Sequence, residues 1–261
     1  MLLIDTHSHL DHPRFDDDRA QVLSRAVSAG VAVQVIPGIK RVWWPSIHSL
    51  CHSHPDLYPA YGLHPLFLSD HREGDIEQLK QWLQNKRAVA VGECGLDFFI
   101  ENPERERQRQ LFEAQLALAA DYRLPVIIHA RKSVEEVTGI LRNHPQVRGV
   151  LHSYSGSKQQ AQRLIDMGFM LGFGGPVTYS RATRLHRLVS DLPLQALLLE
   201  SDAPDQPDAG HQGGRNEPAF LGAVLQTIAR LRGISYEQLA ETTSDNARQL
   251  FNIPPHSSAP R

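Results

Sequence analysis

An alternation of short apolar runs with helical segments is the feature that most constrains how this chain folds. Apolar and β-branched runs recur along the sequence, and most are separated by segments with helical spacing of their apolar residues. The predicted strands are 2–6, 31–37, 57–62, 88–93, 124–130, 148–155, 169–175 and 194–202. Strands that alternate with helices favour a parallel sheet, and eight such units predict a closed (β/α)₈ TIM barrel of the α/β class.

The helices are expected between and after these strands. They are 16–29, 42–53, 77–84, 104–122, 134–144, 158–167, 181–192, 216–231, 236–241 and 244–251. A chain of 261 residues suits one barrel, and no linker or shift in composition marks a second domain. We therefore expect a single domain over residues 1–261, with a frayed tail at about 254–261.

Composition narrows the classes of function. Hydrophobic residues make up 41% and charged residues 21%, which is typical of a soluble globular protein. The net charge of −2 lacks the basic excess of proteins that bind nucleic acid over a broad face, so any such contact should be local. Two cysteines without a C-x-x-C motif argue against a disulfide framework, and no signal peptide or membrane-spanning run is visible. We expect a cytoplasmic monomer with no membrane association and no obligate protein partner.

The first predicted strand leads into a histidine pair, His7-x-His9. With 14 histidines in the chain, chance alone gives roughly 0.7 pairs of this spacing, so the motif proves little by itself. A second pair, His52-x-His54, has the same spacing but precedes a strand, and we interpret it as solvated surface. The aromatic pair Trp43-Trp44 is expected to pack in the core rather than to stack on bases.

Residues of metal-ligand type collect at the carboxyl ends of the predicted strands, where barrels of this class build their active sites. They are Asp5, His7, His9, His64, Glu93, Asp97, His129, His152, Glu200 and Asp202. The amino ends of the same strands carry no such residue. Imidazoles with carboxylates suit zinc, manganese or iron better than magnesium, and one carboxylate among several imidazoles can bridge two ions. For Asp97, a structural and a functional role are equally open.

Six motifs at these strand ends resemble, in order, the TatD-type metal-dependent deoxyribonuclease family of the amidohydrolase-like barrel superfamily. The motifs are DTHSHLD (5–11), GLHP (62–65), GECGLDFF (92–99), PVIIHAR (125–131), GVLHSYSG (149–156) and LLLESDAPD (197–205). The resemblance runs from residue 3 to about 252. The chain departs from the family's common pattern in HSYSG where HCFSG is frequent, in Ser201 within the E-T-D motif, and in the Gly- and Pro-rich segment 205–218.

The resemblance implies two divalent metal ions per chain, zinc, manganese or magnesium. It assigns His7, His9, Glu93 and Asp202 to one ion, and Glu93, His129 and His152 to the other, with Glu93 bridging. Asp202 and Glu93 are the expected catalytic residues, with Asp202 accepting a proton from the attacking water.

Other residues are expected to support this site. His64, Arg131 and Ser155 are expected to contact substrate, because a planar guanidinium suits the oxygens of a phosphate. Glu200 is expected to hydrogen-bond a ligand histidine from behind, and Asp5 is expected either to orient His7 or to hydrogen-bond backbone groups. The ligand histidines must be neutral to bind metal, so activity should fall below about pH 6.

Three functions are compatible with such a site. The leading hypothesis is a metal-dependent hydrolase of ester bonds, a 3′–5′ exonuclease acting on single-stranded DNA ends or on a small phosphoester. The second is a hydrolase of a small ester, amide or lactone, or a deacylase of aminoacyl ends, because one fold supports many chemistries. The third is a metal-stabilised binding protein, against which the ligand set argues, since structural zinc sites are usually closed by four protein ligands.

Overall fold

Eight parallel strands form one sheet in the computed structural model, which describes residues 2–255. In order around the sheet they are β1 (Leu3–Asp5), β2 (Val31–Pro37), β3 (Leu57–Tyr61), β4 (Ala90–Asp97), β5 (Val126–Arg131), β6 (Gly149–Leu151), β7 (Phe169–Phe173) and β8 (Leu197–Leu199). The sheet curls until β8 meets β1, where the Thr6 N–H donates to the Leu199 carbonyl at 3.0 Å. The predicted TIM barrel is confirmed.

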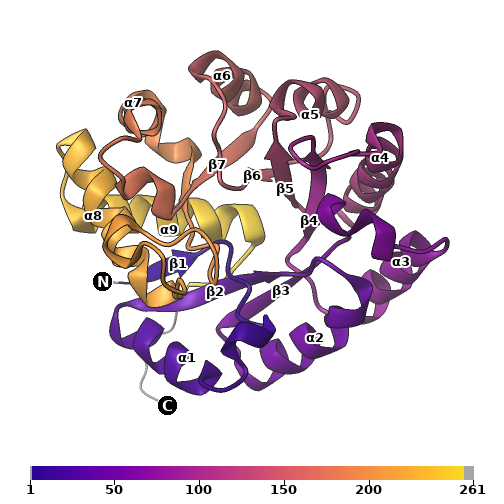
Figure 1. Cartoon of the computed structure of the whole chain (residues 1–261), viewed down its shortest axis with the longest axis horizontal. Helices are drawn as coiled ribbons and strands as arrows, with labels where there is room; N and C mark the ends of the chain where they lie inside the picture. Colours follow the sequence, from indigo (N-terminus) through magenta and orange to yellow (C-terminus); the bar gives the residue numbers. More distant parts are fainter. Residues whose placement is uncertain (1, 256–261) are drawn as a thin grey trace.

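Helices form the outer layer around the barrel (Figure 1). They are α1 (Arg19–Ser28), α2 (Trp44–Ser53), α3 (Asp75–Asn85), α4 (Arg105–Tyr122), α5 (Val134–Leu141), α6 (Lys158–Asp166), α7 (Thr183–Asp191), α8 (Leu221–Arg232) and α9 (Tyr236–Phe251). Local chemistry defines some of their ends: α6 begins with a capping box between Ser157 and Gln160. Within residues 2–255, no helix is long and apolar enough to cross a membrane.

Several helix boundaries differ from the sequence prediction. Residues 236–251 form the single helix α9, not two helices, because Thr242 and Thr243 donate their hydroxyls to carbonyls one turn earlier instead of breaking the helix. The helix predicted at 216–231 begins only at Leu221, after a short 3₁₀ turn, and the helix predicted from residue 16 begins at Arg19. Residues 256–261 of the predicted frayed tail lie outside the described residues.

Alternating strand residues create two apolar layers. One set, which includes Leu3, Ile36 and Leu57, joins the large cluster beneath the helices, while Ile4 and Val35 belong to a second, smaller cluster. Burial of each such side chain stabilises the fold by about 1.5–3 kcal/mol.

Helix α9 packs against the second cluster through the side chains of Ala247 and Phe251. This smaller cluster contains strand residues such as Ile4, Val33 and Leu198, which alternate with those facing the helices. Apolar packing with α9 therefore occupies the part of the barrel away from the polar strand ends.

Candidate metal centre

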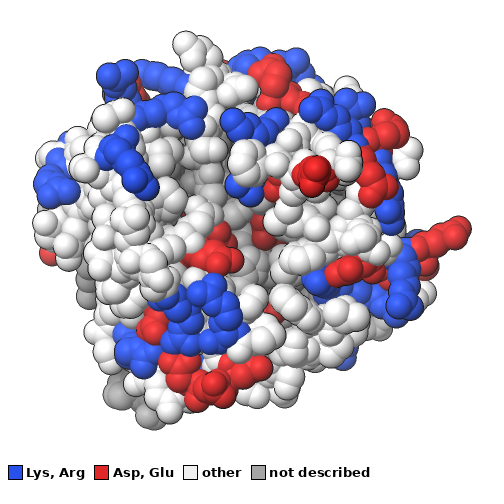
Figure 2. Space-filling view, in the orientation of Figure 1, with Lys and Arg blue, Asp and Glu red and all other residues white. Residues whose placement is uncertain are grey.

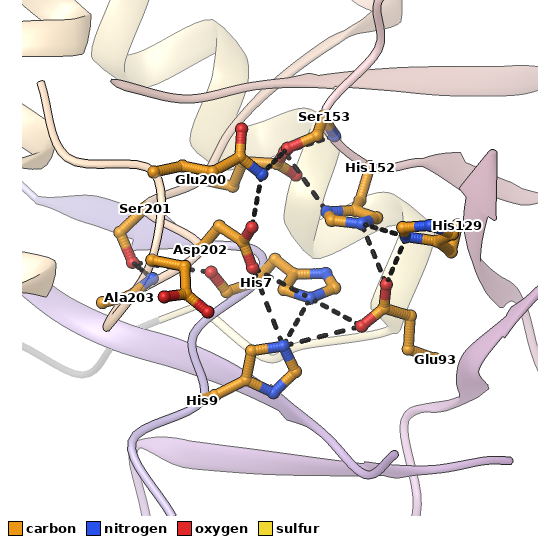
Figure 3. Close-up of polar contacts among 12 residues, drawn as sticks. His7, His9, Glu93, His129, His152, Ser153, Glu200, Ser201, Asp202 and Ala203 are labelled. Atoms are coloured by element: carbon orange, nitrogen blue, oxygen red, sulfur yellow. Dashed lines mark hydrogen bonds and ion pairs between the residues drawn. The ribbon is translucent and has the colours of Figure 1, made fainter. Parts of the chain in front are cut away.

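The carboxyl ends of five strands bring six candidate ligands together. His7 and His9 follow β1, Glu93 lies in β4, and His129 lies in β5. His152 directly follows β6, and Asp202 lies three residues after the end of β8. Figure 3 shows the four histidine rings pointing toward the Glu93 carboxylate. Gly92 has φ +147° and an added Cβ would lie 2.7 Å from the Ile127 carbonyl, so only glycine lets β4 approach β5 this closely at Glu93.

Glu93 lies between two groups of histidines. Its Oε2 is 3.2 Å from His7 Nε2 and 3.5 Å from His9 Nε2. Its Oε1 is 3.1 Å from His129 Nδ1 and 2.9 Å from His152 Nε2. The two oxygens of one buried carboxylate thus face different imidazoles: Oε2 faces His7 and His9, and Oε1 faces His129, His152 and, at 3.0 Å, also His64.

Asp202 faces the first of these pairs. Its Oδ1 lies 3.6 Å from His7 Nε2 and 3.7 Å from His9 Nε2. The Asp202 N–H donates to the His7 carbonyl at 2.8 Å, which ties the loop after β8 to the loop after β1. The other oxygen, Oδ2, accepts a hydrogen bond from the Gln206 amide, whose Nε2 also donates to Ser153 Oγ at 2.7 Å.

Burial and charge together set the protonation of the cluster. Burial opposes ionisation of Glu93, but the surrounding histidines, foremost His64 and His152, hold its pKa well below the ordinary value. Burial lowers the pKa of His64 to about 4, even though Glu93 acts in the opposite direction. Glu93 is therefore an ionised carboxylate in a buried, histidine-lined site.

Asp97, whose role the sequence left open, contacts the candidate ligand His129. Its Oδ2 lies 2.8 Å from His129 Nε2, on the side of the ring opposite Glu93. This arrangement fixes the ring orientation and raises the basicity of Nδ1. The spacing of four residues from Glu93 along one strand was a usable signal, because an even spacing puts both side chains on one face.

The two carboxylates expected behind the histidines both accept backbone N–H groups, which for Asp5 is one of its two expected roles. Asp5 Oδ1 accepts backbone N–H groups, from His7 at 3.2 Å and from Ser201 at 2.9 Å, and it makes no bond to an imidazole among the described residues. Glu200 Oε1 lies 3.7 Å from His152 Nδ1, beyond hydrogen-bond distance, and accepts the Ser153 N–H instead. Both side chains are fully buried, so they shape the loops that carry the ligands.

A cavity of about 570 Å³ opens onto the cluster. The residues expected to contact substrate, His64, Arg131 and Ser155, all line it. His64 also lies within the cluster, with Nε2 3.0 Å from Glu93 Oε1, so the structure places it beside the candidate ligands. Figure 2 shows acidic side chains inside the central hollow of this face and Lys and Arg side chains in separate patches around it.

Other aromatic and histidine side chains were missed or misplaced by sequence reasoning. Trp44 is buried in the core as expected, but Trp43 and His12 line the cavity. His71 is also buried, and its Nε2 lies 2.8 Å from the His64 carbonyl. These positions depend on loop paths that the strand pattern does not specify.

The segment 205–218 is held against α1 by paired charges. Arg215 donates two bonds of 2.7 Å to the Asp18 carboxylate, and Arg25 donates two bonds of 2.8 Å to Glu217. Asn216 is buried and donates to the carbonyls of Ser201 and Asp205 at 2.7 and 2.8 Å. These contacts hold in place the loop that carries Gln206 toward Asp202.

The donor set fits divalent metal ions. Within residues 2–255, each ion-pair partner of the buried Glu93 carboxylate is a histidine, with no Lys or Arg among them. Three groups of residues each place their possible ligand atoms within 4.8 Å of one another. They are His7, Glu93 and His152; His7, His9 and Asp202; and His64, Glu93 and His129. Imidazole nitrogens converging on carboxylate oxygens in this way are typical of zinc and related ions.

Comparison with known proteins supplies the family. Residues 4–252 match the family described as TatD related DNase. The chain belongs to the TatD family. This TatD-family chain is 41% identical over 254 residues to an Escherichia coli K12 protein named uncharacterized metal-dependent hydrolase YjjV, covering 96% of this chain and 98% of that protein. The resemblance expected from the six motifs is confirmed, and the chain is a metal-dependent hydrolase.

Two further comparisons agree with this membership. The crystal structure of the TatD homolog YjjV from E. coli K12 superposes with a TM-score of 0.93 at 39% identity, over 97% of this chain and 98% of that one. A protein of Pantoea ananatis named 3′-5′ ssDNA/RNA exonuclease TatD is 33% identical over 263 residues, covering 96% of this TatD-family chain and all of that protein (100%).

Proposed function

We propose that this chain is an exonuclease that removes nucleotides from the 3′ ends of single-stranded DNA with two divalent metal ions. The observation that carries the proposal is the position of the Glu93 carboxylate, with His7 and His9 at Oε2 and with His129 and His152, beside His64, at Oε1. A carboxylate placed in this way could be shared by two ions about 3.5–4 Å apart, the spacing found in hydrolases that cleave phosphoric esters. The name of the P. ananatis relative supports the choice of substrate.

The proposed metal sites use the residues already described. His7, His9 and Asp202 would hold one ion, His129 and His152 the other, and Glu93 would be shared. Such ions, when bound, supply Lewis acidity toward a phosphoryl oxygen and activate water for attack.

The chain's own groups then have separate tasks. Asp202 would accept the proton of the attacking water, because its carboxylate faces the candidate ligands and is held by Gln206. Arg131 lines the cavity and would donate to the phosphate of the substrate. Ser155, exposed on the loop after β6, would contribute a hydroxyl to the same end of the substrate.

A second function is favoured by the apolar part of the cavity wall. Ile39, Phe173, Val177 and Leu185 line the cavity, and such a surface would accept the acyl part of a small ester or lactone. The same metal site would hydrolyse such a bond.

A substrate panel separates these functions. Purified, metal-loaded protein is incubated with single-stranded DNA bearing a free or a blocked 3′ end, with RNA, with aminoacyl esters and with lactones, each with and without chelator. We expect stepwise shortening of DNA with a free 3′ end, protection by the 3′ block, and full loss of activity with chelator. Rapid lactone or ester hydrolysis beside inert DNA would establish the second function and contradict the first.

A further inference from the structure

Three aromatic side chains lie on successive loops at the open end of the barrel. Trp43 ends the 3₁₀ turn Arg41–Trp43 after β2, Phe67 lies in the turn Pro65–Asp70 after β3, and Phe99 follows β4. We name Trp43, Phe67 and Phe99 the aromatic rim. Trp43 and Phe67 line the cavity, and Phe99 is 58% exposed. A single exposed ring needs no explanation, whereas an exposed ring together with two half-buried rings that line the cavity, all on neighbouring loops, points to a ligand.

Cationic groups lie over the rings of this rim. Lys40 Nζ is 3.9 Å from the centre of the Phe67 ring, and the Arg131 guanidinium is 3.9 Å from the centre of the Phe99 ring. Lys40 is ion-paired with Asp70 at 2.7 Å. The Arg131 guanidinium forms no hydrogen bond or ion pair within the described part of the chain, so its N–H groups are available to a phosphate.

Each phenylalanine contacts a residue that itself contacts a candidate metal ligand. The Phe67 ring lies 5.9 Å from the His64 ring, and His64 contacts Glu93 at 3.0 Å. The Phe99 N–H donates to Asp97 Oδ1 at 2.9 Å, and Asp97 Oδ2 contacts His129. A group resting on the Phe67 ring would thus be near the candidate metal centre, and one resting on the Phe99 ring would be beside Arg131, which lines the same cavity.

We propose that the aromatic rim, with Arg131, is a stacking site for the bases of a single-stranded nucleic acid beside the phosphodiester to be cleaved. This inference rests on the proposed nuclease function. Unpaired bases stack on aromatic side chains, and the phosphates between them bind cations, which requires rings and a free guanidinium side by side. An acyl chain would use the apolar surface but gain nothing from Arg131. Bases of a duplex are already stacked on one another, so the rim selects single strands.

The experiment compares strands with and without bases. The probes are a short phosphorothioate oligothymidylate, chosen to resist cleavage, and the same backbone with abasic residues, and binding to the metal-loaded enzyme is measured by fluorescence anisotropy. Stacking contributes about 1–3 kcal/mol per base, so the wild type should prefer the base-bearing strand by roughly 5- to 150-fold for each stacked base. Phe67→Leu and Phe99→Leu should each reduce this preference, because leucine keeps the apolar surface and loses the aromatic face.

Two variants serve as references. Phe99→Tyr keeps an aromatic face and should keep the preference for bases. Tyr236→Leu removes an aromatic side chain that is 46% exposed at the start of α9 and does not line the cavity, and it should bind like the wild type. Equal binding of both strands by the wild type, or an unchanged preference in the two leucine variants, overturns the inference.

Cleavage of an ordinary phosphodiester strand, measured in parallel, separates this inference from the proposed function. Ring-dependent binding without cleavage would refute the nuclease function and leave the stacking site in place. Cleavage with no dependence on Phe67 or Phe99 would refute the stacking site and leave the nuclease function in place.

Discussion

Two histidine pairs of identical spacing have different surroundings in this molecule. His7 and His9 follow β1, and their Nε2 atoms lie 3.2 Å apart, next to Glu93 and Asp202. His52 and His54 lie at the end of α2, both are exposed, and the His52 ring lies 6.2 Å from the ring of another histidine, His48. The spacing is the same, and only the position in the barrel differs.

The difference teaches that a metal motif is defined by the residues that other strands bring to it. In a parallel barrel, every strand delivers its carboxyl end to the same face, so a pair after β1 meets residues from β4, β5, β6 and β8. The second pair precedes β3 and therefore lies near the opposite ends of the strands. This contrast is open to direct tests.

The largest expected effect comes from replacing both members of one pair. The double variant His7→Ala and His9→Ala should lose the ion between this pair and Asp202, with activity reduced by more than about 100-fold, since even outer partners of metal ligands contribute about 10–100-fold. The matched control is His52→Ala with His54→Ala, which should keep wild-type metal content and activity. Metal content, by mass spectrometry, and hydrolysis rates are measured for both double variants. Metal loss in the control variant would show that the two histidine pairs do not differ in metal binding.

A smaller effect is expected at Asp97, which gives His129 the carboxylate partner that neither His52 nor His54 has among the described residues. Asp97→Asn keeps the side chain's size and removes its charge, so metal affinity or activity should fall by about 10–100-fold. Competition with a chromogenic chelator measures the affinity. Asp191→Asn, which changes an exposed carboxylate paired with Lys158, is the control. Equal metal affinity in the Asp97 variant and the wild type would show that the hydrogen bond to His129 is only structural.

The smallest effect is expected at Gln206, which holds the carboxylate that faces the first pair. Gln206→Leu removes the bonds to Asp202 and Ser153, and hydrogen bonds to charged groups contribute about 1.5–3 kcal/mol. We expect kcat to fall about tenfold, with little change in the free energy of unfolding, because the side chain is only partly buried. Ser153→Ala removes only the second bond and should reduce kcat less. A drop in stability as large as the drop in kcat would instead indicate a structural role.

Much of the candidate centre was predictable because strand ends are a topological property. The pattern of alternating elements predicts which residues end a strand, and the barrel then brings those ends together whatever their separation in sequence. His7 and Asp202 are far apart along the chain, yet His7 O accepts the Asp202 N–H at 2.8 Å. The same reasoning excluded His52-x-His54 without any knowledge of the loops.

The rest of the candidate centre depends on the conformation of the loops. Gln206 and Ser153 both have positive φ, +49° and +46°, and these unusual backbone angles turn the two loops toward each other. The roles of Asp97 and His71 rest on side-chain contacts whose partners come from other loops or elements. No periodicity of apolar residues reports a contact such as the one between His71 and the His64 carbonyl.

The sequence by itself determined the barrel, the face that carries chemistry and the residues available there, because hydrophobic periodicity and strand order are local properties of the chain. The tertiary structure alone decided which oxygen of Glu93 faces which histidines, where Gln206 holds Asp202, and how Trp43, Phe67 and Phe99 line the mouth. These depend on distances between side chains from different strands and loops, which are set only when the whole barrel has packed.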